Sequence, residues 1–144
     1  SEPVELLAGF AEFQVQPSQS WVTRWYESTR LVVHRLAAAD LVLAVQALAD
    51  LRIRPTEDFV LLWYAAFKQK QTDFHARLHI HALDAFARLR VLPSKEYLLI
   101  WYEAAERSFR KWRGPNFPRA LHAFVKMNYK PNDDFVQQWM AYAV

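Results

Sequence analysis

Residues 55–64, which read PTEDFVLLWY, decide the fold because close variants of this stretch recur along the chain. Residues 17–26 read PSQSWVTRWY, residues 93–102 read PSKEYLLIWY, and residues 131–140 read PNDDFVQQWM. The copies begin 38 residues apart each time, so the sequence contains an internal repeat of that period. Fixed periods of about 20 to 50 residues are typical of helical-repeat and other repeat proteins.

Each copy carries the signals of a helix start. A short polar residue follows the proline, and its side-chain oxygen can accept a hydrogen bond from the first backbone N–H groups of a helix. The predicted N-caps are Ser18, Thr56, Ser94 and Asn132. Acidic residues follow in several copies, where they suit the positive end of the helix dipole. Four A-helices therefore begin at the four prolines.

Aromatic residues occur four and eight positions after each proline, which places them on one helix face. The residues at the eighth position are Trp25, Trp63, Trp101 and Trp139. We interpret this aromatic stripe as core rather than as an exposed base-stacking surface, because large rings recur there at helical spacing.

A second amphipathic segment, the B-helix, leads into each proline. A small residue lies eight positions before the proline in every copy, where it permits close helix packing: Gly9, Ala47, Ala85 or Ala123. The pattern predicts an all-α fold, a right-handed α-solenoid of tandem two-helix repeats with about seven to eight helices.

The predicted organisation is one helical-repeat domain over residues 1–144. It has a partial repeat at 1–16, full repeats at 17–54, 55–92 and 93–130, and a partial repeat at 131–144. Because both ends fall inside a repeat and arrays normally finish with polar caps, we expect a longer array and a self-associating isolated piece. Residues 114–118, GPNFP, interrupt the pattern and predict a shortened B-helix that starts near Pro118.

Composition limits the possible functions. A hydrophobic fraction of 53% with 23% charged residues indicates a globular chain. The absence of cysteine excludes disulfides, thiolate metal sites and cysteine nucleophiles. The net charge of +3 permits an anionic partner without requiring one. The apolar runs are far shorter than the roughly 20 residues that a membrane span needs.

Motifs for catalysis or metal binding are not found. Two glycines are too few for a phosphate-binding or dinucleotide-binding loop. His75 and His79 have i, i+4 spacing, but the His-Glu-x-x-His pattern is absent. We therefore expect a protein that is not an enzyme and that holds neither a metal nor a cofactor.

The 38-residue helix-turn-helix unit with its Pro-x-x-x-aromatic start resembles the octotricopeptide repeat family, over essentially the whole chain. The Pro-x-x-x-Trp form is intact from Pro17 to Trp21, whereas Phe59, Tyr97 and Phe135 replace the tryptophan elsewhere. The shorter tetratricopeptide and pentatricopeptide periods fit less well, and FAST-kinase-like and heptatricopeptide arrays remain alternatives.

The resemblance implies an organellar RNA-binding protein of the mitochondrion or chloroplast. It implies that the partner is messenger or ribosomal RNA, within a ribonucleoprotein such as the mitoribosome, with neighbouring proteins and no small-molecule substrate. If two or three side chains of each repeat read one base, three full repeats would give modest specificity.

Two sets of residues are the candidate RNA contacts. Positions 16, 12, 9 and 5 before each proline share one B-helix face. They hold Arg77, His81, Asp84 and Arg88, followed in the next repeat by Arg119, His122 and Lys126, whereas the first full repeat has Ala39, Leu43, Gln46 and Asp50. The turns between A- and B-helices add Lys68, Lys70, Arg107, Arg110, Lys111 and Arg113.

Basic clusters attract phosphates, and Trp112 within the last cluster suggests base stacking. The alternative for the B-helix stripe is an ordinary solvated face. The alternative for the turns is the preference of cations for helix C-termini.

A protein-binding scaffold within a large organellar complex is the second functional hypothesis. Leu61, Leu62, Leu99 and Ile100 make the two middle A-helices nearly apolar on every side. Such helices are normally buried, so we expect a neighbouring protein or a tightly wound superhelix to cover them.

Overall fold

The computed structural model describes residues 1–142, and this part of the chain is all-helical. The α-helices are α1 (Glu2–Glu12), α2 (Gln19–Arg30), α3 (Ala38–Asp50), α4 (Glu57–Lys70), α5 (Ala76–Arg88), α6 (Lys95–Ser108), α7 (Asn116–Lys126) and α8 (Asp133–Tyr142). Short 3-10 helices η1 (Val33–Arg35), η2 (Gln71–Asp73) and η3 (Phe109–Lys111) follow α2, α4 and α6. The all-α prediction is confirmed. The last two residues of the predicted repeat 131–144 lie outside the described residues.

The A-helices α2, α4, α6 and α8 begin at the predicted caps. The hydroxyls of Ser18, Thr56 and Ser94 accept the backbone N–H of the aromatic residue three positions later, at 3.2, 3.1 and 3.1 Å. The Asn132 Oδ1 atom accepts the Phe135 N–H at 2.7 Å. Caps of this kind stabilise a helix by about 1 kcal/mol each, so each A-helix start is well determined.

The B-helices α1, α3, α5 and α7 end in a common turn. The residue after the C-cap has a positive φ in every case: Gln14 (56°), Arg52 (57°), Arg90 (58°) and Asn128 (51°). The next N–H bonds back into the helix, as from Val91 to the Phe86 carbonyl at 3.0 Å. This Schellman arrangement satisfies carbonyls at the helix end, and it sets the direction of the chain toward the following proline.

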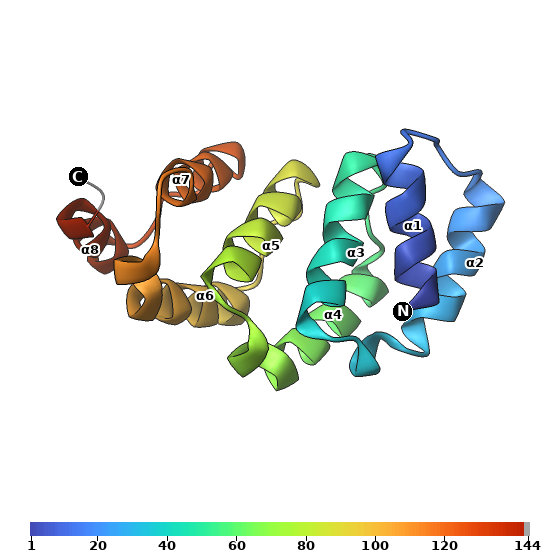
Figure 1. Cartoon of the computed structure of the whole chain (residues 1–144), viewed down its shortest axis with the longest axis horizontal. Coiled ribbons are helices and arrows are strands. Elements are labelled where there is room, and N and C mark those ends of the chain that lie inside the picture. Colours follow the sequence, from blue (N-terminus) through green and yellow to red (C-terminus); the bar gives the residue numbers. More distant parts are fainter. Residues whose placement is uncertain (143–144) are drawn as a thin grey trace. The chain divides into compact units, whose positions relative to one another are not determined.

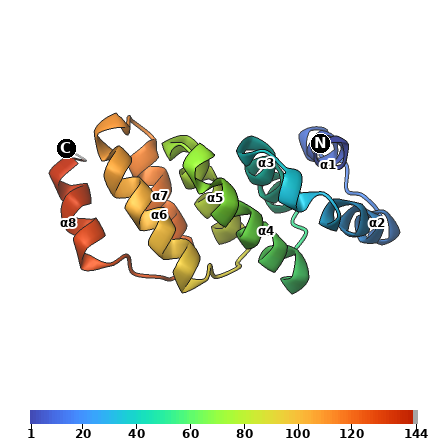
Figure 2. The same cartoon turned by 90° about the horizontal axis from the view of Figure 1, so that it is seen from below.

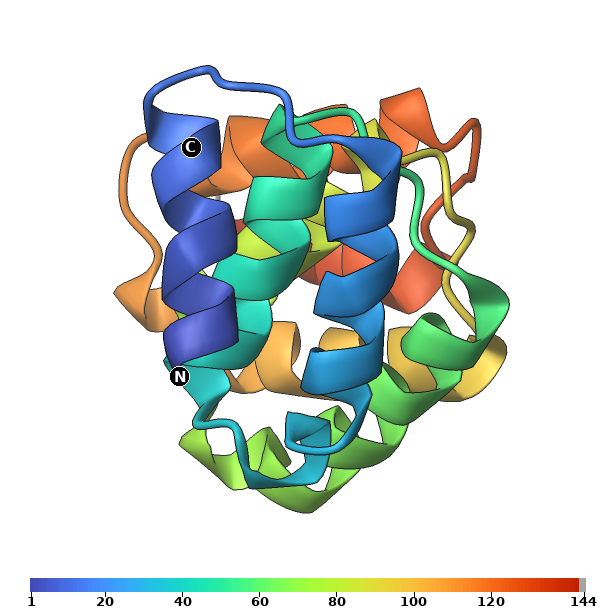
Figure 3. The same ribbon diagram turned by 90° about the vertical axis from the view of Figure 1, so that its right-hand side faces the viewer.

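The helices group into two compact units, unit 1 (Ser1–Phe74) with α1 to α4 and unit 2 (His75–Val144) with α5 to α8. In unit 1, α1 packs against α3 and α2 against α4, and α1 and α3 run in parallel (Figures 1 and 3). In unit 2, α5 packs against α7, and α6 lies beside α8 (Figure 2). Each unit therefore uses the same contacts between two successive helix pairs.

Buried tryptophan indoles join each of the first three A-helices to the B-helix before it. The Nε1–H groups donate to main-chain carbonyls 22 residues earlier: Trp25 to Pro3 (2.8 Å), Trp63 to Leu41 (2.8 Å) and Trp101 to His79 (2.9 Å). These three side chains are at most 3% exposed, which confirms their interpretation as core. In α8, Trp139 is half-buried and stacks on Phe117.

The B-helix α7 is shortened as predicted. It has 11 residues, against 13 in α3 and α5. It starts at Asn116, two residues before Pro118, which confirms the predicted start near that proline. A proline in the first helical turn leaves no intrahelical hydrogen bond unmade, because its missing N–H would have no partner there.

Three of the four positions where close helix approach was expected are buried, since Ala47, Ala85 and Ala123 are at most 2% exposed. The prediction is wrong for Gly9, which is half-buried and where an added Cβ would meet nothing within 4 Å. Among the described residues, no helix is long and apolar enough to cross a membrane.

Candidate nucleic-acid interface

The predicted polar stripe runs along α5 and α7 in unit 2. Arg77, His81, Asp84 and Arg88 follow one another at spacings of four, three and four residues, which brings them to one side of α5. Arg77 is exposed, and the other three side chains are half-buried. The apolar residues on the opposite side, such as Leu83 and Phe86, are fully buried, so packing of the core side turns the polar side outward.

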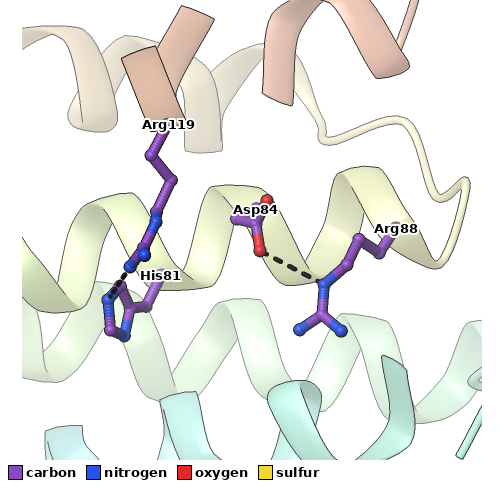
Figure 4. Close-up of polar contacts among 4 residues, drawn as sticks. All are labelled: His81, Asp84, Arg88 and Arg119. Carbon is purple, nitrogen blue, oxygen red and sulfur yellow. Dashed lines mark hydrogen bonds and ion pairs between the residues drawn. The ribbon is translucent and has the colours of Figure 1, made fainter. Parts of the chain in front are cut away.

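Helix packing brings His81 of α5 against Arg119 of α7. The Arg119 Nη1 atom lies 2.7 Å from the His81 Nε2 atom (Figure 4). A guanidinium has only donors, so Nε2 must be the acceptor, and the neutral imidazole carries its proton on Nδ1. The two residues are 38 positions apart and occupy equivalent places in successive repeats.

The electrostatic surroundings keep His81 neutral. Burial lowers the pKa of the imidazole, and the positive charges of Arg119 and Arg77 lower it further. Asp84 raises the pKa of His81, whereas His75 lowers it slightly.

Asp84 and Arg88 form an ion pair along α5. The Arg88 Nε atom lies 3.2 Å from the Asp84 Oδ2 atom, at i, i+4 spacing (Figure 4). Solvent-accessible ion pairs at i, i+4 spacing contribute only a few tenths of a kcal/mol. Arg88 therefore has a carboxylate partner on its own helix.

The rest of the stripe lies on α7, where Arg119, His122 and Lys126 are exposed. We call the set Arg77, His81, Arg88, Arg119, His122 and Lys126 the B-helix face of unit 2. In unit 1 the equivalent positions of α3 hold Ala39, Leu43, Gln46 and Asp50, so the basic character belongs to unit 2.

The basic turn after α6 is only partly as predicted. Arg107, Arg110 and Lys111 are exposed. Arg113 is also exposed, but its Nη1 atom donates to the main-chain carbonyls of Arg110 and Trp112, both at 2.9 Å. Arg113 therefore also stabilises the turn that follows η3.

Trp112 is not a stacking platform, and this prediction is wrong. Its side chain is 4% exposed, its Nε1–H donates to the Ser108 hydroxyl at 2.9 Å, and its ring packs against Phe109. The equivalent repeat positions hold Leu36 and Phe74, which are also buried. The periodicity therefore contained the signal that Trp112 is core.

In unit 1, the turn after α4 holds the remaining predicted contacts. Lys68 is exposed and Lys70 is half-buried at the C-terminal end of the helix. Both positions suit the negative end of the helix dipole.

The sequence-based argument missed Arg90. It lies with Lys126 at a groove of about 270 Å³ in unit 2, which is also lined by Val91, Leu92 and Met127. Arg90 is the positive-φ residue that ends α5, three positions before Pro93. The equivalent residues in the other copies are Gln14, Arg52 and Asn128, so the repeat gave no consistent signal of a basic turn at this position.

Exposed apolar residues on α4 and α6 are relevant to the second hypothesis, a protein-binding scaffold. Leu61 and Leu99, at equivalent repeat positions, are 67% and 59% exposed. Leu62 and Ile100 are half-buried. The fold thus leaves one leucine of each middle A-helix in solvent.

The two histidines at i, i+4 spacing have different environments, because His75 is exposed before α5 and His79 is 3% exposed within it. Within residues 1–142, no group of three or more potential ligands is arranged to hold a metal ion.

No protein-family model matches the sequence, and no curated protein matches it either.

Proposed function

We propose that the chain is a non-catalytic RNA-binding α-solenoid of the octotricopeptide type, which holds messenger or ribosomal RNA within an organellar ribonucleoprotein. The family resemblance of the 38-residue repeat supports this proposal. The observation that carries it is the B-helix face of unit 2, where Arg119 of α7 meets His81 of α5 at 2.7 Å. Two adjacent helices there present basic groups on one surface.

The chemistry of this face suits a phosphodiester backbone. Arg77, Arg88, Arg119 and Lys126 supply four positive charges, against the single carboxylate of Asp84 on the same stripe. Arginine and lysine contacts to phosphates provide most of the affinity of nucleic-acid binding that is not sequence-specific. The exposed Arg107, Arg110 and Lys111 precede α7 and extend the positive potential toward its N-terminal end.

The test is a fluorescence anisotropy titration with single-stranded RNA of mixed sequence, between about 50 and 200 mM salt. Replacing Arg77, Arg119 and Lys126 by glutamate reverses three charges and removes three of the proposed phosphate contacts. We expect weaker binding and a salt slope that is smaller by about 2, since each contact to a single strand contributes roughly 0.7. Reversal at Arg107, Arg110 and Lys111 tests the turn cluster separately.

The matched control reverses three exposed arginines of unit 1, namely Arg24, Arg30 and Arg35. This control changes the net charge equally but leaves the B-helix face of unit 2 intact. An equal loss in both variants would assign the binding to net charge alone and contradict the proposed site.

A protein-binding scaffold is the second candidate, and the exposure of Leu61 and Leu99 favours it. An apolar side chain held in solvent at a repeated position is suited to a partner protein. Absence of RNA binding even at low salt would favour the scaffold over the RNA-binding protein.

A further inference from the structure

The groove beside Arg90 in unit 2 lies between two successive repeats. It has a volume of about 270 Å³, and it is lined by the turn after α5, which holds Arg90, Val91 and Leu92, and by Lys126 and Met127 where α7 ends. Pockets for drug-sized ligands span about 300–1,000 Å³. The groove therefore suits a smaller group, of the size of one ring system.

The lining of the groove combines cations with apolar side chains. No hydrogen bond or ion pair joins Arg90 or Lys126 to another described residue, so their donors are available to a ligand. Val91 and Met127 are half-buried, and Leu92 is 62% exposed. Apolar side chains beside such donors suit a flat nucleobase, which has an apolar face and acceptors at its edge.

The position of the groove favours a base over a phosphate. The groove lies where α5 and α7 end, and the last carbonyls of a helix give its C-terminus a partial negative charge of about half a unit. This charge repels a phosphate but attracts the N–H groups of a base. The positive charges of Arg90 and Lys126 offset only part of this effect, so a base fits the groove better than a phosphate does.

Arg90 gives the groove a preference among bases. A guanidinium carries its donors in a fixed planar fork. Guanine presents the O6 and N7 acceptors side by side, and arginine pairs with both atoms in the commonest base-specific contact. Adenine has an amino group in place of O6, so it would meet the guanidinium with a donor. Arg90 therefore favours guanine.

The groove continues the B-helix face of unit 2, because Lys126 belongs to both. On α7, Lys126 lies seven residues after Arg119, which is two helical turns or about 10 Å along the axis. A strand whose phosphates contact Arg119 and Lys126 therefore reaches the groove.

The equivalent positions of unit 1 have a different character. The turn after α1 holds Gln14, Val15 and Gln16, and Asp50 and Leu51 stand where α3 ends. None of these five residues is basic, and the carboxylate of Asp50 would repel a strand. The chemistry of the groove thus belongs to unit 2 and is not a general consequence of the repeat.

We propose that this groove binds one guanine base of the RNA strand that lies on the B-helix face of unit 2. Arg90 donates to the O6 and N7 atoms, Leu92 and Met127 pack on the ring, and Lys126 contacts the adjoining phosphate. The proposal rests on the proposed RNA-binding function. It adds a preference for one base, which contacts to phosphates alone do not supply.

The experiment measures the affinity of the whole chain for short oligouridine strands by fluorescence anisotropy, at about 50 mM salt. Four strands carry guanosine, adenosine, uridine or an abasic ribose at the same central position. We expect the guanosine strand to bind about tenfold more tightly than the other three, because only guanine offers both acceptors to Arg90.

Two variants test the groove directly. Arg90→Gly and Leu92→Ser should each reduce the preference for guanosine to less than about twofold. Glycine suits the φ of 58° at position 90, and Leu92 is exposed, so both variants should fold. Circular dichroism melting checks this expectation.

The matched control is Gln14→Gly, which makes the same change at the equivalent position of unit 1, where φ is 56°. A second control, Arg30→Gln, removes one exposed positive charge from unit 1. Both controls should keep the preference for guanosine, because neither residue lines the groove.

The outcomes separate the groove from the proposed function. Equal affinity for the four strands, or a preference that survives both groove variants, overturns the groove proposal. If reversing charge at Arg77, Arg119 and Lys126 still weakens binding in that case, the proposed function stands without the groove. A chain that binds none of the strands contradicts both proposals.

Free guanosine monophosphate tests another source of the same base. We expect it to compete far more weakly than the unlabelled guanosine strand, since it makes no contact with the rest of the B-helix face. Competition as strong as that of the strand would assign the groove to a free nucleotide and overturn the proposal.

Discussion

The hydroxyls of Tyr26 and Tyr102 connect α2 and α6 to the turn at the next proline. Tyr26 of α2 donates to the Arg54 carbonyl at 3.3 Å. Burial raises the pKa of Tyr26 to about 12, while a hydrogen bond from the Thr56 main chain lowers it. Burial also raises the pKa of Tyr102, the equivalent residue of α6, whose hydroxyl accepts the Asn132 N–H at 3.4 Å.

Alkaline pH should therefore destabilise the fold through Tyr26. Its folded pKa of about 12 lies above the ordinary value of 10.0, so the folded state favours the neutral phenol. This stability is fully present below pH 10.0 and is lost as the pH rises toward 12. Because Tyr26 is partly exposed, solvent screening reduces the expected loss to about 1–2 kcal/mol.

The measurement is the free energy of unfolding in urea at about pH 8 and pH 11. Tyr26→Phe removes the hydrogen bond of the hydroxyl and should be about 1 kcal/mol less stable than the natural chain at neutral pH. When the pH is raised, its free energy of unfolding should fall by less than that of the natural chain. Tyr142→Phe is the control, because Tyr142 is 43% exposed. An unchanged pH dependence in Tyr26→Phe would contradict the role of Tyr26.

At the scale of the helix, the A-helix starts were predictable because their signals are local. A cap such as Ser94 and the aromatic at Tyr97 lie three residues apart and meet in one hydrogen bond. The contact between His81 and Arg119 was not predictable in this way. Helical spacing shows which residues share a face, but the meeting of two helices depends on how their cores pack.

The turns between helices show a second limit of local patterns. Three of the four residues that end the B-helices with positive φ are Gln14, Arg52 and Arg90, which have no intrinsic preference for that conformation. The prediction that Trp112 stacks on a base was wrong for another reason. It relied on the basic residues beside Trp112, whereas the equivalent residues of the other repeats, Leu36 and Phe74, are apolar and buried. Comparison of repeat positions predicts burial better than local composition does in this chain.

Replacing Arg90 by glycine should stabilise the protein. Arg90 has a φ of 58°, and a left-handed conformation costs a non-glycine residue about 1–2 kcal/mol. Glycine at position 90 also raises the conformational entropy of the unfolded chain, which offsets part of this gain. We therefore expect about 0.5–1 kcal/mol of net stabilisation. Arg107→Gly, inside α6, should instead destabilise by about 1 kcal/mol. Urea unfolding of both variants checks the opposite signs.

At the scale of the whole chain, the two units differ in the charge of their B-helices. The outward positions of α1 and α3 include Glu5, Glu12 and Asp50, whereas those of α5 and α7 carry the basic face. The basic face that we propose for RNA binding therefore belongs to unit 2, because the equivalent positions of unit 1 carry acidic or uncharged residues.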